Sequence, residues 1–354
     1  MRLFAYGGLA LVLAACGGEP EAVEPPREPT REEIARAEAF LATQTPLPPG
    51  WSFETIPFEG DAFLRVGMAS PEKPRATILF VPGYTSSPEL ASDFLARWYD
   101  LGFEVASVDL PGQGGSVRRE DDYQKTYTGD FGFYGRSVDA ATAYVASKRR
   151  SDGPLIVAGD SFGGHSLLRA AADGGLEEAD GLLPIVPAVE PVLEAPKWLV
   201  KFFVGRDVRA GRGAEYLPGA GRWSPDAWKE FNWEYCGDRE DRNFKNTAIQ
   251  ILRPEMRVGG ASKEWGLGMV RSGEQMLKDP DLKAWSKPVQ MVTAGKDVIV
   301  RNEAAERLCE RGMKSCELTR IEEATHCVYL EDDPTQEKVH AALLHLLSRI
   351  EEAS

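Results

Sequence analysis

The sequence predicts an α/β fold with a mostly parallel eight-stranded sheet, helices on both faces of that sheet and a helical lid insertion. Continuous apolar runs such as residues 77–81 and 154–158 are typical of strands that are buried on both faces. Segments with helical spacing alternate with these runs, which indicates parallel strands joined by helical crossovers. The 354 residues suffice for one such domain with an insertion.

Composition is that of an ordinary globular protein, with 43% hydrophobic and 27% charged residues. The formal net charge is −14 and the isoelectric point is near 5.0. Nucleic-acid binding needs clustered Lys and Arg to neutralise phosphates, so this balance argues against a nucleic-acid partner. It favours solubility and says nothing about the fold.

Residues 1–15 are predicted to be a bacterial lipoprotein signal peptide. Arg2 precedes an apolar core, residues 3–13, that is too short to span a bilayer as a stable helix. The sequence Leu-Ala-Ala-Cys that ends at Cys16 resembles a lipobox, which implies cleavage before Cys16 and lipidation of that cysteine. The alternative is a plain secretory signal with an incidental cysteine. A glycine at position 17 favours the outer membrane, with the protein facing the periplasm.

Residues 16–48 are predicted to be a lipidated tether followed by a short helix. The stretch from Gly17 to Thr30 is rich in proline and glutamate, so we expect an extended chain with little to bury. Thr30 and Glu33 form the pattern of a capping box that opens a helix through Leu41. The folded domain is expected to cover residues 51–350.

The order of strands and helices follows from apolar runs, turn residues and helical spacing. Two leading antiparallel strands precede the parallel ones, and a last helix closes the chain. The expected strands are residues 53–56, 62–68, 77–81, 103–109, 154–159, 182–187, 288–294 and 317–321, and the expected helices are 90–101, 133–146, one beginning just after residue 161, and 335–350.

Ser161 is the candidate nucleophile. It lies in residues 159–164, Gly-Asp-Ser-Phe-Gly-Gly, where a buried strand turns at once into a helix. Small residues at 159 and 163 leave room for this sharp turn, which forces the serine into a strained conformation at the edge of the sheet. The following helix points its free N–H groups at the same place.

A serine hydroxyl needs a base and an orienting carboxylate. Of the four histidines, two lie on the last helix and His165 lies one helical turn after Ser161, so packing roles are expected for them. His326 follows the last strand and is the candidate base. Asp297 follows the preceding strand and is the candidate carboxylate. Asp109 fits a loop-structuring role, and Glu190 stays a minor alternative to Asp297.

Five short segments together resemble the α/β-hydrolases grouped as lysophospholipases, monoacylglycerol lipases and serine aminopeptidases. The resemblance covers about residues 51–350 and extends, through residues 253–260, Trp265 and residues 273–275, to bacterial lysophospholipases. It implies a serine hydrolase without a metal or organic cofactor, in the chain order nucleophile, acid, base. The five segments are Pro82-Gly83, residues 109–116, the turn at Ser161, residues 295–297 and residues 324–326.

In this fold the loop after the third strand and the residue after the nucleophile supply the backbone N–H groups of the oxyanion hole. These are the N–H groups of Tyr84 and Phe162. Related enzymes often have a histidine before the glycine of this loop, where this chain has Pro82. The donors are backbone groups, so the assignment stands.

The insertion at about residues 188–285 is expected to form a lid over Ser161, since it is far longer than a strand–helix connection requires. It is rich in aromatic and basic residues. An aromatic lid suits an acyl chain or a membrane surface, and the basic residues suit a lipid phosphate. A small core within the lid and a solvated lid surface explain the same residues. They include Trp198, Phe202, Trp223 and Trp265, with Lys197, Lys201, Arg206, Arg209 and Arg212.

Four cysteines remain after Cys16, and an even number in an exported protein permits disulfides. Cys309 and Cys316 flank a short turn and form the favoured pair. A bridge from Cys236 to Cys327 would tie the lid to the loop of His326, and four free thiols remain the alternative. None of the cysteine spacings resembles a zinc site.

These observations predict a lipid-anchored serine hydrolase that cleaves the ester of a single-chain lipid, a lysophospholipid or a monoacylglycerol. An aminopeptidase, for which Glu190 and Glu194 would hold the substrate amine, or an acyltransferase would use the same three residues. A lipid-binding envelope lipoprotein without catalysis is the alternative from another class. Fold does not decide between substrates.

Overall fold

The computed structural model describes residues 27–119, 121–126, 130–226, 235–237 and 240–353. The predicted signal peptide, Cys16 and most of the tether lie outside these residues. Among the described residues no helix is both long and apolar enough to cross a membrane.

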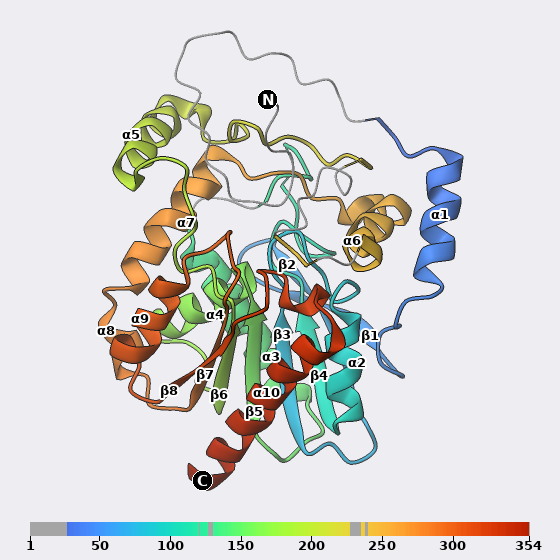
Figure 1. Cartoon of the computed structure of the whole chain (residues 1–354), viewed down its shortest axis with the longest axis vertical. Helices are drawn as coiled ribbons and strands as arrows, with labels where there is room; N and C mark the ends of the chain where they lie inside the picture. Colours follow the sequence, from blue (N-terminus) through green and yellow to red (C-terminus); the bar gives the residue numbers. More distant parts are fainter. Residues whose placement is uncertain (1–26, 120, 127–129, 227–234, 238–239, 354) are drawn as a thin grey trace.

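The core of the molecule is an eight-stranded sheet with the strand order β1-β2-β4-β3-β5-β6-β7-β8 (Figure 1). Pairs β1/β2 and β2/β4 are antiparallel, and all the others are parallel. The predicted fold class is confirmed. The strands are β1 (Ser52–Pro57), β2 (Phe63–Ala69), β3 (Ala76–Val81), β4 (Phe103–Val108), β5 (Leu155–Asp160), β6 (Gly181–Ile185), β7 (Val289–Ala294) and β8 (Cys316–Ile321).

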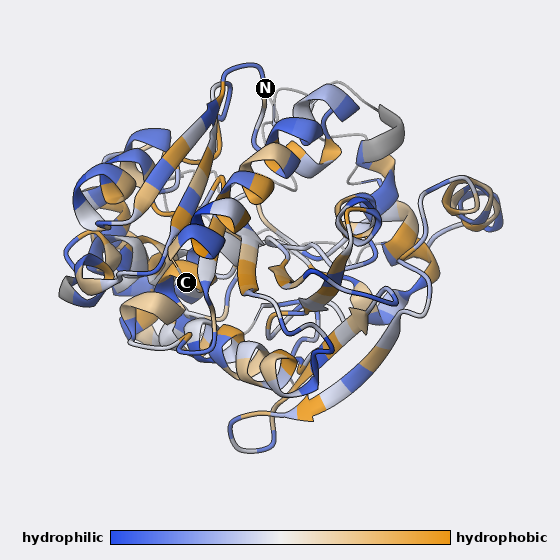
Figure 2. Cartoon of the chain, turned by 90° about the horizontal axis from the view of Figure 1, so that it is seen from below, coloured by the Kyte–Doolittle hydropathy of each residue, from blue (hydrophilic) through white to orange (hydrophobic). Residues whose placement is uncertain are grey.

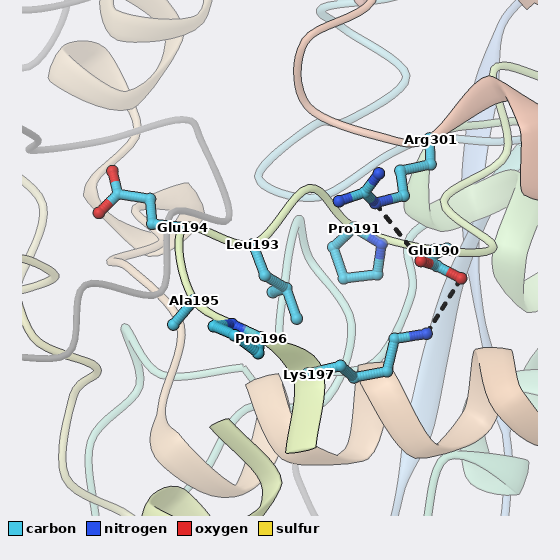
Figure 3. Close-up of a pocket in the computed structure, with 8 residues that line it drawn as sticks. All are labelled: Glu190, Pro191, Leu193, Glu194, Ala195, Pro196, Lys197 and Arg301. Carbon is cyan, nitrogen blue, oxygen red and sulfur yellow. Dashed lines mark ion pairs between the residues drawn. The ribbon is translucent and has the colours of Figure 1, made fainter. Parts of the chain in front are cut away.

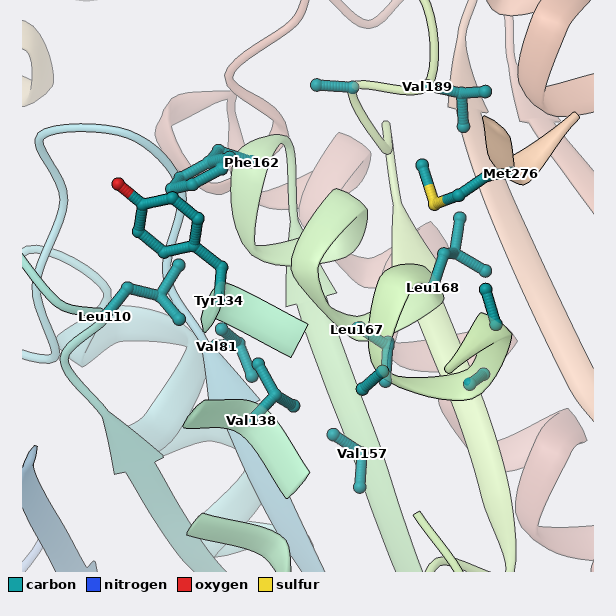
Figure 4. Close-up of a cluster of buried hydrophobic side chains, with 14 of the residues drawn as sticks. Val81, Leu110, Tyr134, Val138, Val157, Phe162, Leu167, Leu168, Val189 and Met276 are labelled. Atoms are coloured by element: carbon teal, nitrogen blue, oxygen red, sulfur yellow. The ribbon is translucent and has the colours of Figure 1, made fainter. Parts of the chain in front are cut away.

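Side chains alternate between the two faces of the sheet along each strand. Since every residue of β3 is buried, both faces are apolar and both are covered by helices. Ile78 and Phe80 of β3 pack with α2 (Ser92–Asp100) and α10 (Asp333–Ala353). Leu79 and Val81 pack on the opposite face with α3 (Gly132–Lys148) and α4 (Phe162–Ala172). Figure 4 shows part of this second layer, where Val138, Val157 and Leu167 meet. α9 (Asn302–Gly312) covers the same face near β7 and β8.

The described part of the segment between β6 and β7 contains four α-helices, which are α5 (Lys197–Asp207), α6 (Glu240–Leu252), α7 (Lys263–Met276) and α8 (Pro280–Ala284). α5, α6 and α7 lie above the sheet in Figure 1. α7 packs on α4, which begins directly after Ser161, and α5 packs on α7. In Figure 2 the helices around the sheet carry both hydrophobic and hydrophilic residues, as expected for helices with one face on the sheet and one on the surface.

The predicted N-terminal helix is present as α1 (Arg31–Leu41), and Thr30 and Glu33 form its capping box. α1 packs on α6 of the insertion. Ala37 is fully buried in this contact, and the Phe40 and Phe244 rings are 5.1 Å apart. The short helix expected after the tether thus rests on the insertion.

The four cysteines among the described residues form two disulfides. Cys309–Cys316 joins α9 to β8, with a Cα–Cα distance of 5.2 Å. Cys236–Cys327 joins the insertion to the loop that carries His326, with a Cα–Cα distance of 4.5 Å. Both pairings considered from the sequence are therefore found, including the one that rested only on the expected position of the lid.

Candidate active site

Ser161 lies in the sharp turn between β5 and α4, with φ +50° and ψ −114°. A non-glycine residue with positive φ is strained and persists only where its surroundings hold it. Two neighbouring glycines make the turn possible. A Cβ on Gly163 would lie 1.9 Å from the Val81 carbonyl oxygen, and a Cβ on Gly159 would lie 2.7 Å from the Gly163 backbone. The turn predicted from the sequence is present.

The structure brings Ser161, His326 and Asp297 together from three loops at the carboxyl ends of β5, β8 and β7. His326 Nε2 is 2.7 Å from Ser161 Oγ, and His326 Nδ1 is 2.7 Å from Asp297 Oδ2. The other carboxylate oxygen of Asp297 accepts the backbone N–H groups of Ile299 (2.8 Å) and Val300 (2.9 Å). These bonds fix the carboxylate, which in turn orients the imidazole.

Electrostatics favour the charged form of His326. Burial lowers the pKa of this imidazole. The charge of Asp297, the hydrogen bond to Asp297 and the charge of Asp160 together raise it by more than burial lowers it, so the net pKa lies above the ordinary 6.5. An imidazole held in this way can accept a proton from Ser161 and is stabilised as imidazolium by Asp297.

The N–H groups of Tyr84 and Phe162 lie where the sequence analysis expects them. Phe162 is the first residue of α4, so its N–H has no partner within the helix. Tyr84 lies in the loop after β3, whose glycine packs against the nucleophile: a Cβ on Gly83 would lie 3.2 Å from Ser161 Cβ. Within the described part of the chain neither N–H donates to another group. Both are thus free to bind an oxyanion.

The remaining histidines and the alternative acids do not join the site. His165 is fully buried, with Nδ1 2.8 Å from the Ala188 carbonyl oxygen and Nε2 2.9 Å from Ser272 Oγ. It links α4 to α7, which is the packing role expected for it. Asp109 forms an ion pair with Arg65 and accepts the N–H of Gly115, as a loop-structuring residue does.

Glu190, the minor alternative to Asp297, forms ion pairs with Lys197 (3.0 Å) and Arg301 (3.4 Å). These residues line an open pocket of about 220 Å³ beside the start of α5 (Figure 3). In this view the Glu194 side chain points away from the Glu190 ion pairs. The two glutamates therefore form no shared acidic site.

Aromatic rings pack on one side of Ser161. Trp265 of α7 lies 4.6 Å from the Tyr84 ring and 5.1 Å from the Phe162 ring, measured between centroids. Tyr134 of α3 lies 4.8 Å from the Phe162 ring. This cluster packs the insertion against the side chains of both residues that supply the candidate oxyanion donors.

Two polar side chains near the site were not identified from the sequence. Asp160 precedes Ser161, is 3% exposed and accepts the Gly83 N–H at 2.9 Å. Its burial raises its pKa to about 7. Gln113 is fully buried and contacts the backbone on both sides of Tyr84. Their positions in the sequence could have drawn attention to them. Asp160 lies within the nucleophile motif, and Gln113 lies in the glycine-rich loop at residues 109–116.

No group of three or more His, Cys, Asp or Glu residues that could hold a metal ion is found in the described ranges.

A family model described as "Serine aminopeptidase, S33" matches residues 72–333, which is most of the chain and includes Ser161, Asp297 and His326. The chain belongs to this family. Its members share the α/β-hydrolase fold described above.

Two characterised relatives share about a quarter of the aligned residues with this chain. Lysophospholipase L2 of Escherichia coli K12 is 26% identical over 235 residues, which cover 65% of this chain and 65% of that protein. The same protein from a second E. coli strain matches equally well. The chain thus spans slightly less than two thirds of the length of these relatives.

Solved structures agree on the fold. A soluble variant of Saccharomyces cerevisiae monoglyceride lipase, in complex with a substrate analogue, gives a TM-score of 0.62 at 17% identity and covers 88% of this chain and 97% of its own. A thermostable carboxyl esterase from Bacillus coagulans gives 0.63 at 14% identity, covering 86% of this chain and all of its own. At such identities the likeness shows the fold alone.

Proposed function

We propose that this protein is a serine hydrolase that cleaves the carboxylic ester of a single-chain lipid, a lysophospholipid or a monoacylglycerol. The observation that carries the proposal is the hydrogen-bonded series Ser161–His326–Asp297, with both distances at 2.7 Å, beside two free backbone N–H groups. A binding protein has no need of a nucleophile, a base and an orienting acid in this arrangement.

The reaction proceeds through an acyl-enzyme. Ser161 Oγ attacks the ester carbonyl carbon while its proton moves to His326 Nε2, and the N–H groups of Tyr84 and Phe162 hold the resulting oxyanion. When the intermediate collapses, the bond to the leaving oxygen breaks and His326 gives that oxygen the proton. Water then attacks the acyl group with His326 as base again, and the products are a fatty acid and free Ser161.

A single acyl chain is favoured by the apolar surroundings of Ser161 and by the relatives. Trp265 of the insertion is buried against Tyr84 and Phe162, so the insertion next to the nucleophile turn is aromatic, which suits an enzyme that takes an alkyl chain. The curated relative is a lysophospholipase, and one similar structure is a monoglyceride lipase. We also propose the location expected from the sequence, a lipid anchor at Cys16 in the bacterial outer membrane, facing the periplasm.

The family's description favours a second candidate, an aminopeptidase. Such an enzyme must hold the substrate's ammonium group near Ser161 with unpaired acidic side chains. Glu190 is already paired with Lys197 and Arg301, and Glu194 points away from it (Figure 3). These contacts favour the esterase over the aminopeptidase.

Free fatty acid release by the protein lacking its first sixteen residues tests the proposal. Lysophosphatidylcholine, lysophosphatidylethanolamine, monoacylglycerol and an aminoacyl anilide are offered side by side, with glycerol added in one series to detect acyl transfer. Release from a single-chain lipid that is lost in Ser161→Ala supports the proposal. Cleavage of the anilide alone would establish the aminopeptidase, and binding without cleavage would establish the lipid-binding alternative.

A further inference from the structure

The backbone on both sides of Tyr84 is held by the side chain of Gln113. Gln113 Nε2 donates to the Gly83 carbonyl oxygen at 2.7 Å, and its Oε1 accepts the Thr85 N–H at 3.2 Å. One amide group therefore bridges the residue before Tyr84 and the residue after it. Gln113 is fully buried, so water does not compete for these bonds.

Asp160 provides a second point of attachment for the same loop. Its Oδ1 accepts the Gly83 N–H at 2.9 Å, so both backbone polar groups of Gly83 are bound by buried side chains. Thr85 has φ +61°, a conformation that a threonine adopts only where its surroundings enforce it. The loop thus has a strained shape and depends on these contacts to keep it.

We propose that Gln113 is a positioning residue that aims the Tyr84 N–H at the oxyanion, with Asp160 as the second anchor of the loop. This inference rests on the proposed function, because it assigns a purpose to the loop only if an oxyanion forms there. The Gln113 side chain bonds the loop backbone at Gly83 and Thr85, so it would act through the loop and not on the reacting atoms.

The residue type matters because the bridge needs a donor at one end and an acceptor at the other. An unionised side-chain amide supplies both within one planar group. A backbone donor lowers the barrier only when it is aimed in advance at the place where charge develops. Gln113 is itself fixed by the turn that contains it, since its N–H donates to the Leu110 carbonyl oxygen and its carbonyl oxygen accepts the Ser116 N–H.

Two substitutions at this position separate positioning from general stability. Gln113→Met keeps the length and burial of the side chain but removes both hydrogen bonds. Gln113→Glu keeps an acceptor for Thr85 and loses the donor to Gly83 until the introduced carboxyl is protonated. The matched control is Gln290→Met, since Gln290 is also a buried glutamine (1% exposed), with hydrogen bonds to Glu317 and Thr319, and lies on β7.

Three readouts are expected to change together in Gln113→Met. Ester kcat falls about 10- to 100-fold, part of the loss seen when an oxyanion donor is removed outright, while KM stays within about threefold because ground-state contacts persist. Affinity for a trifluoromethyl ketone, whose adduct with Ser161 carries an oxyanion, falls by a similar factor. Amide hydrogen exchange of residues 83–86 becomes faster. In Gln113→Glu the activity relative to wild type recovers as pH falls. Gln290→Met shows none of these changes.

Unchanged hydrogen exchange at residues 83–86 in Gln113→Met would overturn the inference, whatever the activity. So would a loss of kcat with full ketone affinity, because the oxyanion donor would then be in place. If Gln113→Met does not fold, the same two tests on Gln113→Glu decide. Failure of the wild-type protein to cleave any ester would refute the proposed function separately, since the exchange measurement needs no substrate.

Discussion

Ser161 depends on two residues that reach it from distant parts of the chain. His326 lies 165 positions away and Asp297 lies 29 positions from His326. Each follows a strand of the parallel sheet, and the carboxyl ends of parallel strands meet at one edge. This is why Ser161 and both of its partners were predictable from the sequence.

The acid limb of the pH profile tests the electrostatics of His326. The base must be neutral to act, so kcat/KM falls as pH drops through the pKa of His326, which the charge of Asp297 holds above 6.5 against the opposing effect of burial. We expect a midpoint above 6.5 on a slow ester substrate. Asp297→Asn shifts this midpoint down and lowers kcat by roughly 10³- to 10⁴-fold. A wild-type midpoint below 6.5 would contradict the geometry.

Gly163→Ala tests the turn that carries Ser161. The added methyl would lie 1.9 Å from the Val81 carbonyl oxygen, which is backbone and cannot move aside. We expect loss of activity and a destabilisation of about 3 kcal/mol or more, measured by denaturant unfolding.

Gly205→Ala is the matched control for this prediction. Gly205 lies in α5, and the nearest atom to an added Cβ is 3.4 Å away, at the end of the Arg209 side chain. Alanine should stabilise that helix slightly. Equal effects of the two substitutions would show that the close approach at Gly163 is unimportant.

The roles of Gln113 and Asp160 could not be predicted from the sequence. The motif around Ser161 identifies Asp160 as its neighbour, but nothing in the sequence indicates that the Asp160 carboxylate bonds to Gly83, 77 positions earlier. The same holds for Gln113, 30 positions from Gly83. Such roles depend on how closely two loops approach each other in the folded chain, and a local sequence pattern does not determine that distance.

At the scale of helices, α1 and the insertion behave as one unit. Arg257 forms an ion pair with Glu28 at 2.9 Å, and Arg27 forms one with Asp226 at 2.8 Å. Together with the packing of Ala37 and Phe40 against α6, these contacts tie the segment before residue 41 to the insertion.

Ala37→Asp tests this contact. Ala37 is fully buried between α1 and α6, and an unpaired carboxylate there costs about 2–4 kcal/mol. We expect trypsin to cleave after Arg31 or Arg36 at least about tenfold faster, because α1 spends more time undocked. Ala39→Asp, the same change at an exposed position of α1, should leave the rate unchanged. Equal rates in both variants would show that α1 is not held by α6.

The capping box made α1 itself predictable, whereas its place was not. Thr30 and Glu33 are a local signal, but the apolar partner of α1 is Phe244 and its neighbours on α6, some two hundred positions later. For the insertion, the sequence likewise predicted a helical lid but no individual helix bounds. A long connection has a weaker hydrophobic pattern than a buried strand, so its helices are harder to delimit.

At the scale of the whole molecule, two buried histidines link the layers of the fold. His165 joins α4 to α7, and His340 of α10 accepts the Trp98 indole N–H of α2 at 3.0 Å. Burial lowers the pKa of each to about 4. Both imidazoles are therefore neutral at pH 7. Protonation would turn the ring nitrogen that accepts a hydrogen bond into a donor, and that bond would be lost.

The contribution of these two histidines to stability should consequently decrease as pH falls from 6.5 to about 4. Asp160, whose pKa burial raises to about 7, contributes in the opposite direction, so the histidine effect is read from the difference between a variant and the wild type. Below 6.5 the unfolded chain binds protons that the folded histidines exclude, so stability that is fully present above pH 6.5 is lost toward the folded pKa. His340→Gln should reduce this loss in a urea unfolding series, and His345→Gln should not, since His345 is exposed. An identical pH dependence in His340→Gln and wild type would contradict the assignment of a neutral His340.

The sheet was the most predictable part of the molecule. The runs expected at residues 77–81 and 288–294 differ from β3 and β7 by a single residue at one end, because strands buried on both faces leave a strong apolar signal. The crossing of β3 between β4 and β5 is not a local property and follows only from the packing of the whole sheet.

Covalent labelling with a fluorophosphonate, mapped by mass spectrometry, tests the central claim most directly. The account predicts one label per chain on Ser161, no label in Ser161→Ala, and much slower labelling in His326→Gln because the hydroxyl loses its base. Labelling at another serine, or equal labelling rates with and without His326, would show that Ser161 is not an activated nucleophile.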